Sequence, residues 1–210
     1  MLPPTIPIFP LPNVVLFPNV FLPLHVFEPR YREMVEDCVR GDRIIGMMLL
    51  RPGWEKDYEG RPPVYPIGCA GVMTHSERLA DGRFNIVLRG MEKFRITGEE
   101  SGRSYRVARV DPVIEPSADR ERETIRLERR RLESLLVPRA EGHHADLKVP
   151  SSMPDEDLVN ALAQYLEFDP VEKQALLERD GLLERCRSLI ELLEMKVIVA
   201  RHPWGREGTH

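Results

Sequence analysis

Cysteines and long apolar runs are scarce in this sequence, and their scarcity excludes several classes of protein. The 210 residues hold three cysteines, Cys38, Cys69 and Cys186, and no two of them form a C-x-x-C pair. An odd, widely spaced set indicates neither a zinc knuckle nor a disulfide framework, and it favours a reducing compartment. No stretch reaches the roughly 18 uninterrupted apolar residues of a membrane helix. We therefore expect a soluble, cytoplasmic protein that does not enter a membrane.

The sequence also lacks an excess of positive charge and a phosphate-binding loop. Its formal net charge is −4, and residues 1–116 hold equal numbers of basic and acidic side chains. Nothing in it forms the basic footprint that attracts nucleic acid through counterion release. No G-x-x-x-x-G-K-[ST] segment is present, so the backbone cradle for nucleotide phosphates is missing. We expect no cofactor and no ATP hydrolysis.

Prolines, by contrast, are concentrated at the start, where eight of the 19 lie within the first 31 residues. They stand between β-branched and aromatic residues and interrupt the apolar run, and no charged segment precedes them. Because proline cannot donate to a sheet ladder, it is confined to strand starts, edges and bulges. The segment therefore predicts short strands joined by stiff turns, and it does not resemble a signal peptide.

A helix and a buried strand are expected next along the chain. Apolar residues at three- and four-residue spacing predict a helix from Glu28 to Val39, and Gly41 is expected to end it in the left-handed conformation. The apolar run from Ile44 to Leu50 predicts a buried strand. Residues 51–63 are rich in proline, glycine and charge, and they predict a loop.

The clearest hairpin lies between residues 66 and 96. Asp81-Gly82 separates two extended runs there, and this dipeptide favours a type I′ turn. Apolar residues then occupy every second position from residue 84 to 88, which is the period of a strand with one buried face. Gly90 predicts a bulge or a tight bend, and a last strand is expected over residues 104–114.

From Pro116 the pattern becomes helical. Charged residues with an apolar stripe predict a helix over residues 119–137, with spaced ion pairs such as Glu123–Arg126 and Arg129–Glu133.

Three more helices are expected beyond it. Capping residues at Ser151 and at Asp169, the latter in a capping box with Glu172, predict the starts of two, and Tyr165 belongs to the buried stripe of the first. Gly181 precedes the last helix, whose apolar stripe runs from Leu182 to Val197. We therefore expect a β-rich subdomain over residues 1–116, a helical bundle over residues 117–200 and a flexible tail over residues 201–210.

Three blocks of sequence carry a family resemblance: the proline-punctuated start, a strand–turn–strand block and a helical block. In order they are residues 6–31; Gly68 with Val72, Asp81-Gly82-Arg83, Leu88-x-Gly90 and Phe94-Arg95-Ile96; and Leu158-Val-Asn-x-Leu162-Ala-Gln164, Phe168-Asp169-Pro170-x-Glu172-Lys173-Gln174 and Leu176-Leu177-Glu178. Together they resemble the Lon protease N-terminal domain, also called the Lon substrate-binding domain. Cys69, where the family usually has threonine, and the loop around Trp54 depart from that pattern.

The resemblance implies an α+β fold, in which a β-rich, PUA-like pseudobarrel with one short helix precedes an α-helical bundle. In full-length Lon proteases this region helps to recognise unfolded or tagged substrates, and similar modules occur in cereblon-type ubiquitin adaptors and as stand-alone bacterial proteins. The Ser–Lys dyad of Lon proteolysis belongs to a different domain. The resemblance therefore implies no enzyme but a module that recognises a polypeptide or protein partner, as an adaptor or a chaperone-like factor.

One polar loop holds residues of the types that bind metal ions. Glu141, His143, His144 and Asp146 lie within it, but their spacing matches no helical or loop pattern of metal ligands. The sequence therefore predicts a solvated loop and no metal site.

An acid–base pair can also be drawn from His25 and Glu28, with Cys38 as a nucleophile. In an extended segment, however, positions 25 and 28 point to opposite faces, because the side-chain period is two. We expect Glu28 to cap or charge the start of the following helix, with Arg30 and Tyr31 packed at that junction, and we expect no catalytic site.

RNA binding is the alternative function, because PUA-like folds in other families bind RNA and the β-rich half holds a run of arginines. Acidic residues are interleaved with these arginines, and no aromatic-rich stacking signature accompanies them. The pattern favours an alternately charged, solvent-facing side of a sheet and argues against a nucleic-acid partner. The arginines are Arg78, Arg83, Arg89, Arg95, Arg103, Arg106 and Arg109, and the acids are Glu77, Asp81, Glu92, Glu99 and Glu100.

Trp54 and Tyr58 are the candidate binding residues. Both are large aromatic residues in a loop that is too polar to belong to the core. An exposed aromatic side chain on a rigid scaffold is a suitable anchor for a partner. The alternative interpretation is that Trp54 folds back and covers an end of the barrel.

Overall fold

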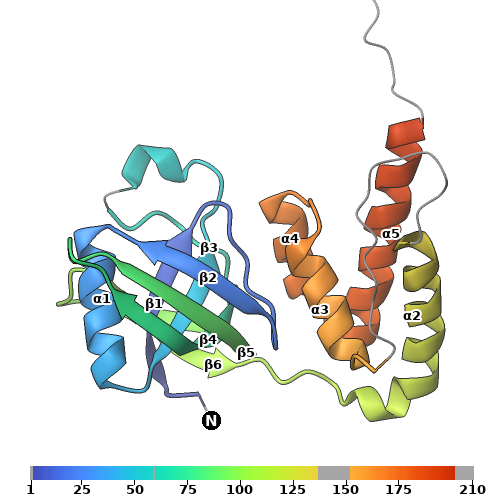
Figure 1. Ribbon diagram of the computed structural model, residues 1–210, viewed down its shortest axis with the longest axis horizontal. Coiled ribbons are helices and arrows are strands. Elements are labelled where there is room, and N and C mark those ends of the chain that lie inside the picture. The colour runs from blue at the N-terminus through green and yellow to red at the C-terminus, as the bar shows by residue number, and fades with distance from the viewer. Residues whose placement is uncertain (1, 59, 137–151, 202–210) are drawn as a thin grey trace, which may run out of the picture. The chain divides into compact units, whose positions relative to one another are not determined.

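The computed structural model describes residues 2–58, 60–136 and 152–201, and they form two compact units (Figure 1). The sheet unit combines residues 1–114 with 160–178, and the helical unit combines residues 115–159 with 179–210. The division expected at residue 116 stays a prediction about which parts of the chain fold independently. The predicted tail over residues 201–210 lies almost wholly outside the described residues.

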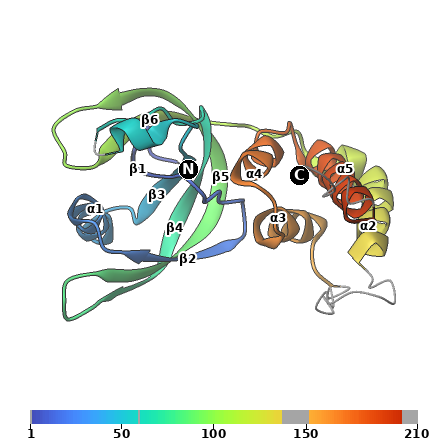
Figure 2. The same ribbon diagram turned by 90° about the horizontal axis from the view of Figure 1, so that it is seen from above.

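Six strands make up one sheet, in the order β2-β5-β4-β3-β1-β6. β5 also pairs with β6, so the five strands other than β2 close a ring (Figure 2), while β2 pairs with the first part of β5. β1 and β3 run parallel, and the other pairs are antiparallel. The strands are β1 (Thr5–Leu11), β2 (Phe21–Val26), β3 (Ile44–Leu49), β4 (Ile67–Arg78), β5 (Phe84–Glu100) and β6 (Arg106–Pro112).

The interior of the ring is filled by apolar side chains from several strands. Phe94 of β5, Ile8 of β1 and Met48 of β3 are buried there, together with two small residues, Ala70 and Ala108. The strand predicted at residues 44–50 is confirmed, and all six residues of β3 are buried. The alternation predicted in β5 is also confirmed, because residues 84, 86 and 88 are buried.

Helix α1 (Pro29–Arg40) confirms the predicted helix after the proline-rich start. Its buried residues are Tyr31, Met34, Val35 and Cys38. The prediction for Gly41 was wrong: its φ is −112°, and its N–H donates to the carbonyls of the last helical turn. The left-handed residue is Arg43 (φ 60°), whose backbone N–H donates to Cys38 O (3.1 Å). The chain therefore reverses two residues later than the glycine indicates.

The predicted hairpin is confirmed, but its predicted turn type was wrong. A type I′ turn needs positive φ at both central residues, and here Gly82 (φ 81°) has it while Asp81 does not. Gly82 N–H donates to Leu79 O (2.9 Å), and Leu79 N–H donates to Arg83 O (2.8 Å). The connection is thus a three-residue loop with glycine at its left-handed position.

Gly90 allows residues 17–20 to approach β5 closely. Its carbonyl accepts from Asn19 N–H (3.0 Å), its N–H donates to Val20 O (2.9 Å), and a Cβ at this position would lie 2.0 Å from Phe17 O. The register between β4 and β5 also shifts beside Gly90. The predicted irregularity is confirmed, and close backbone approach is the reason that glycine stands there.

Side-chain amides of helix α3 (Asp155–Tyr165) tie it to the segment before β2. Gln164 Oε1 accepts from Phe17 N–H (3.0 Å), and Gln164 Nε2 donates to Phe21 O (3.0 Å). Asn160 Nδ2 donates to Pro18 O (3.1 Å). Asn160 and Gln164 therefore satisfy backbone groups that the sheet leaves without partners.

Helix α4 (Pro170–Leu177) begins with the predicted capping box, in which Glu172 accepts from the backbone N–H of Asp169 (2.8 Å). It is held to the strands by Gln174, whose Nε2 donates to Ile67 O (2.9 Å). Tyr165 was predicted to be buried but is 63% exposed, and only its hydroxyl is engaged, on Phe21 O (2.7 Å).

The helical unit is built on α2 (Arg122–Leu136) and α5 (Leu182–Arg201), with a 3₁₀ turn at Ala118–Glu121 before α2. The predicted ion pairs Glu123–Arg126 and Arg129–Glu133 are confirmed. In α5 the predicted stripe is buried as far as Ile190, but the prediction for Val197 was wrong, because this residue is exposed. Among the helices that the structure describes, none is long and apolar enough to cross a membrane.

Candidate functional site

The loop that carries the two aromatic candidates is tied to the start of α1. Trp54 opens a 3₁₀ turn (Trp54–Asp57), is half-buried, and packs edge-on against Tyr58 with 5.4 Å between ring centroids. Tyr58 Oη donates to Glu28 Oε1 (2.6 Å). Glu28 stands at the N-cap of α1 without a capping hydrogen bond, and its carboxylate pairs with Arg30 (3.0 Å). Glu28 therefore acts as the charged group predicted at this helix start, and it also anchors the loop.

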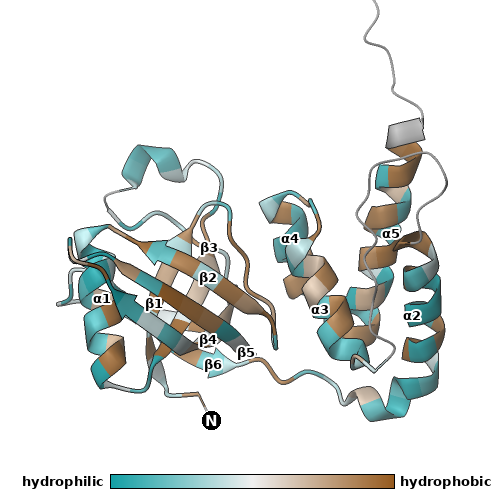
Figure 3. Cartoon of the chain, in the orientation of Figure 1, coloured by the Kyte–Doolittle hydropathy of each residue, from teal (hydrophilic) through white to brown (hydrophobic). Residues whose placement is uncertain are grey.

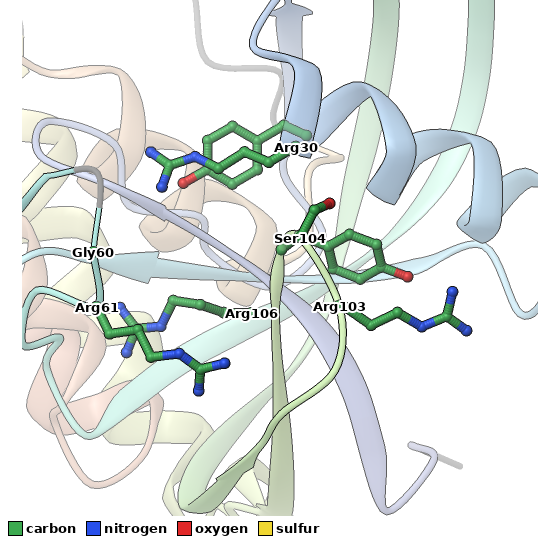
Figure 4. A pocket seen from close by; sticks show the side chains of 8 residues that line it. Arg30, Gly60, Arg61, Arg103, Ser104 and Arg106 are labelled. Carbon is green, nitrogen blue, oxygen red and sulfur yellow. The ribbon is translucent and has the colours of Figure 1, made fainter.

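Beside this loop lies a hollow of about 200 Å³ that we call the arginine pocket (Figure 4). Its walls come from the start of α1, from the loop after Tyr58, and from the end of the turn between β5 and β6. Of the eight lining residues that the structure describes, four are arginines and none is acidic. The lining residues are Arg30, Tyr31, Gly60, Arg61, Arg103, Ser104, Tyr105 and Arg106.

Two of these arginines are fixed in place. Arg106 is buried, its Nε and Nη2 donate to Glu99, and its Nη1 donates to Pro62 O (2.7 Å). Arg30 donates to Glu28 and to Tyr58 O, and its guanidinium lies 4.7 Å from the centroid of the Tyr31 ring. Charge-assisted hydrogen bonds and stacking on an aromatic face hold such groups in one orientation.

The other two arginines are held loosely. Arg61 is 46% exposed, and its contacts are long: 3.5 Å to Glu99 and 3.4 Å to Glu100 O. Arg103 is 56% exposed and makes one ion pair, with Asp37 (2.9 Å). Surface pairs of this kind contribute about 0–1 kcal/mol each. Both side chains are therefore able to turn toward a ligand at little cost.

The two phenol groups of the pocket remain protonated at neutral pH. Burial raises the pKa of Tyr31 to about 12. Burial and the hydrogen bond to Asp37 (2.8 Å) raise the pKa of Tyr105. The described part of the pocket thus presents guanidinium and hydroxyl donors, an arrangement suited to binding an anion.

A second surface of the sheet unit is the outer edge of β2. Among the residues that the structure describes, no strand pairs with this edge, because β2 pairs only with β5. Phe21 O is bound by α3 side chains, so backbone groups of the odd-numbered residues of β2 point away from β5. Pro23 is one of these residues, and its missing N–H therefore costs no ladder bond.

Exposed apolar side chains accompany this edge. Phe21 is 50% exposed and Phe27, directly after the strand, is 60% exposed. The His25 and Phe27 rings are stacked with centroids 6.4 Å apart. Figure 3 shows β2 as hydrophobic along most of its length. Exposed aromatic residues next to an unpaired strand edge form a surface on which an extended chain can bind.

The structure does not assemble the other chemistry considered from the sequence. His25 contacts Asn85 and Arg83, whereas the Cys38 thiol donates to Ile44 O (3.6 Å), so His25, Glu28 and Cys38 form no triad. Burial also raises the pKa of Cys38 to about 12. The predicted loop residues Glu141, His143, His144 and Asp146 lie outside the described residues.

The arginine pocket itself was not predicted. Arg106 was assigned to a solvent-facing side of the sheet, and that prediction was wrong, because Arg106 is buried against Glu99. Its neighbours Arg30 and Arg61 are far away in sequence and approach it through the closure of the strand ring. The order of charged residues along the chain does not indicate which distant arginines will line one pocket.

Comparison with known proteins identifies a family over most of the chain. A family model described as the ATP-dependent protease La (LON) substrate-binding domain matches residues 5–195. Lon protease 2 of Myxococcus xanthus is 28% identical over 200 residues, which cover 93% of this chain and 24% of that protein. Lon protease 2 of Syntrophobacter fumaroxidans is 30% identical over 181 residues, which cover 84% of this chain and 22% of that protein. This chain thus spans about a quarter of the length of the relatives it matches.

Solved structures show the same fold. The Lon N-terminal domain protein from Xanthomonas campestris has a TM-score of 0.60 and 22% identity, with 89% of this chain and 97% of that chain covered. The N-terminal domain of Mycobacterium avium complex Lon protease has a TM-score of 0.64 and 19% identity, with 90% and 98% covered. The family model matches the substrate-binding domain and no catalytic domain. The chain belongs to the LON substrate-binding domain family.

Proposed function

We propose that this chain is a non-catalytic module that recognises extended polypeptide, as an adaptor or a chaperone-like factor in protein quality control. Family membership over residues 5–195 supports a substrate-recognition role. The observation that carries the proposal is the outer edge of β2 with its exposed Phe21 and Phe27. We infer a cytoplasmic location, in keeping with three free cysteines.

An extended chain is recognised at this edge through its backbone first. An added strand gains main-chain hydrogen bonds from the partner's edge, and its alternate side chains enter apolar sites. At β2 the backbone groups of His25 face outward, whereas Phe21 O is already occupied by Gln164 and Tyr165. Binding is therefore centred on His25 and Phe27, with Phe21 contributing apolar contact. Such a short ladder gives weak, sequence-tolerant affinity, which suits a recognition module for many substrates.

The architecture supports the same conclusion. We infer that the closed ring of five strands is the PUA-like pseudobarrel and that the helices after residue 116 form the bundle expected from the resemblance. A rigid ring holds β2 at its rim without further strands to cover it. No comparison supports the RNA-binding alternative, which was based on the arginines of the β-rich half. Three of these arginines, Arg78, Arg83 and Arg106, form ion pairs with Glu36, Asp81 and Glu99.

A titration with a permanently unfolded, fluorescently labelled polypeptide tests the proposal. We expect binding at tens of micromolar or tighter, and roughly fivefold weaker binding for Phe27→Ser, which removes an exposed aromatic contact. Leu127→Ser is the matched control, because Leu127 is 59% exposed but belongs to the helical unit. Absence of binding by the unaltered chain at tens of micromolar contradicts the proposal.

A further inference from the structure

We propose that the arginine pocket binds a carboxylate of the recognised polypeptide, either an acidic side chain or the chain's own C-terminal group. This inference rests on the proposed polypeptide function and adds a chemical preference to it. It would make this chain favour extended segments that carry negative charge near an apolar stretch.

The charge distribution around the pocket favours an anionic ligand. None of the lining residues that the structure describes is acidic, and Glu99 is the carboxylate partner of both Arg61 and Arg106. One carboxylate carries half the charge of two guanidinium groups, so Glu99 does not neutralise both side chains. Two further carboxylates border the lining residues: Asp57 accepts from the backbone N–H of Arg61 (3.3 Å), and Glu33 accepts from Ser104 Oγ (2.6 Å).

Two of the four arginines of the pocket are fixed in place, and the side chains of the other two are able to reorient. Arg30 and Arg106 are locked by hydrogen bonds to carboxylates and to backbone carbonyls. Arg61 and Arg103 are the exposed pair with long or single contacts. In Figure 4, Arg103 extends from one side of the hollow while Arg61 and Arg106 lie on the other. A bound carboxylate can therefore replace the weak contacts of Arg61 with bidentate hydrogen bonds.

The pocket continues into neighbouring hollows that have room for the rest of a peptide. A second hollow shares Arg103 and Tyr105 with it, and a third shares Tyr105 and Pro7 with the second. The third is lined by the buried apolar side chains of Ile6 and Ile44 and also by the charged residues Asp37, Asp42 and Arg43. An extended segment can thus place its carboxylate among the arginines and an apolar side chain beyond Tyr105.

Three short unfolded peptides of otherwise identical sequence separate the two sources of the carboxylate. One carries a single glutamate and an amidated C-terminus, one has glutamine in its place, and one combines the glutamine with a free C-terminus. We expect the full-length chain to bind at least one carboxylate peptide roughly two- to fivefold more tightly than the neutral peptide, with the difference reduced by salt. The peptide that binds more tightly than the neutral peptide identifies whether the pocket takes a side-chain or a C-terminal carboxylate.

Substitutions of residues at the rim of the arginine pocket test whether the preference for the charged peptide arises there. Arg61→Gln is expected to abolish the preference for the charged peptide and to leave binding of the neutral peptide unchanged, whereas Glu33→Gln is expected to strengthen it. Arg95→Gln removes an exposed arginine of β5 outside the pocket and is expected to change nothing. Equal binding of all three peptides, or equal losses with Arg61→Gln and Arg95→Gln, overturns the carboxylate site while leaving the polypeptide function intact.

Separate titrations with N-acetylglutamate amide, which carries a side-chain carboxylate, and with N-acetylglycine, which carries a C-terminal carboxylate, test the pocket without any peptide. We expect the arginine Nε–H resonances of Arg61 and Arg103 to shift in nuclear magnetic resonance spectra, and that of Arg95 to stay. Shifts of Arg61 and Arg103 support the site even if no unfolded polypeptide binds, in which case the proposed function fails alone. Absence of any shift, or an equal shift of Arg95, overturns the inference.

Discussion

At the scale of single residues, burial accounts for the state of the cysteines. Cys38, Cys69 and Cys186 are all buried, and each keeps its thiol outside any disulfide. Burial raises the pKa of Cys38 and of Cys186 to about 12, because a thiolate is poorly solvated away from water. The odd cysteine count indicated no disulfide framework, and none of the three cysteines forms a disulfide in the structure. Their role is that of small apolar core residues.

These thiols should be almost unreactive in the folded protein. For Cys38 and Cys186, a pKa near 12 lowers the thiolate fraction at about pH 8 about a thousandfold relative to an ordinary cysteine, and the thiolate is the reacting form. Cys69 is protected from a reagent by its complete burial. We expect an aromatic disulfide reagent to modify all three cysteines only after the chain is unfolded in denaturant. Rapid, stoichiometric modification of one cysteine in native buffer would contradict the burial described here.

At the scale of helices and strands, the features that the sequence predicts correctly are those determined by residues close together in the chain. The helix from residue 29 follows from apolar spacing, and the capping box at Asp169 and Glu172 follows from two side chains three residues apart. The parts predicted poorly depend on distant partners. Gly41 and Tyr165 are examples. The left-handed conformation predicted for Gly41 occurs at Arg43 instead, and the side chain of Tyr165 is exposed while its hydroxyl donates to Phe21 O. The arginine pocket could not be predicted for the same reason.

The amide side chain of Gln164 in α3 allows the contribution of a partner distant in sequence to the free energy of unfolding to be measured. Gln164 is the acceptor for the buried N–H of Phe17. We expect Gln164→Leu to destabilise the fold by about 1–3 kcal/mol, because the substitution leaves that N–H buried without an acceptor. Denaturation in urea, followed by circular dichroism, measures the change.

Tyr165→Phe is the matched control for Gln164. Both side chains donate to Phe21 O, but Tyr165 is largely exposed, so water can replace its hydroxyl. We expect this substitution to change the free energy of unfolding by less than about 0.5 kcal/mol. If the two substitutions cost the same, the buried N–H of Phe17 is not what makes Gln164 important.

At the scale of the whole molecule, the sheet unit draws on two separate stretches of the chain. Residues 160–178 group with the strands, although a helical segment of the other unit precedes and follows them. They contribute buried apolar residues such as Phe168 and Leu176, and they supply Asn160, Gln164 and Gln174 to backbone groups of the sheet unit. We therefore expect the ring of strands to depend on a segment from beyond residue 116.

Truncation at the boundary expected from the sequence tests this dependence. A fragment of residues 1–116 lacks the partners of Phe17 N–H, Pro18 O and Ile67 O and exposes the apolar surface that α3 and α4 cover in this unit. We expect its melting temperature to lie about 10 °C or more below that of the full chain, with increased binding of an apolar dye. A synthetic peptide of residues 155–179, added in excess, should raise the melting temperature of the fragment by mass action. If the fragment alone melts cooperatively at the temperature of the full chain, residue 116 is a true folding boundary and the amide contacts of α3 and α4 add little to the stability of the ring.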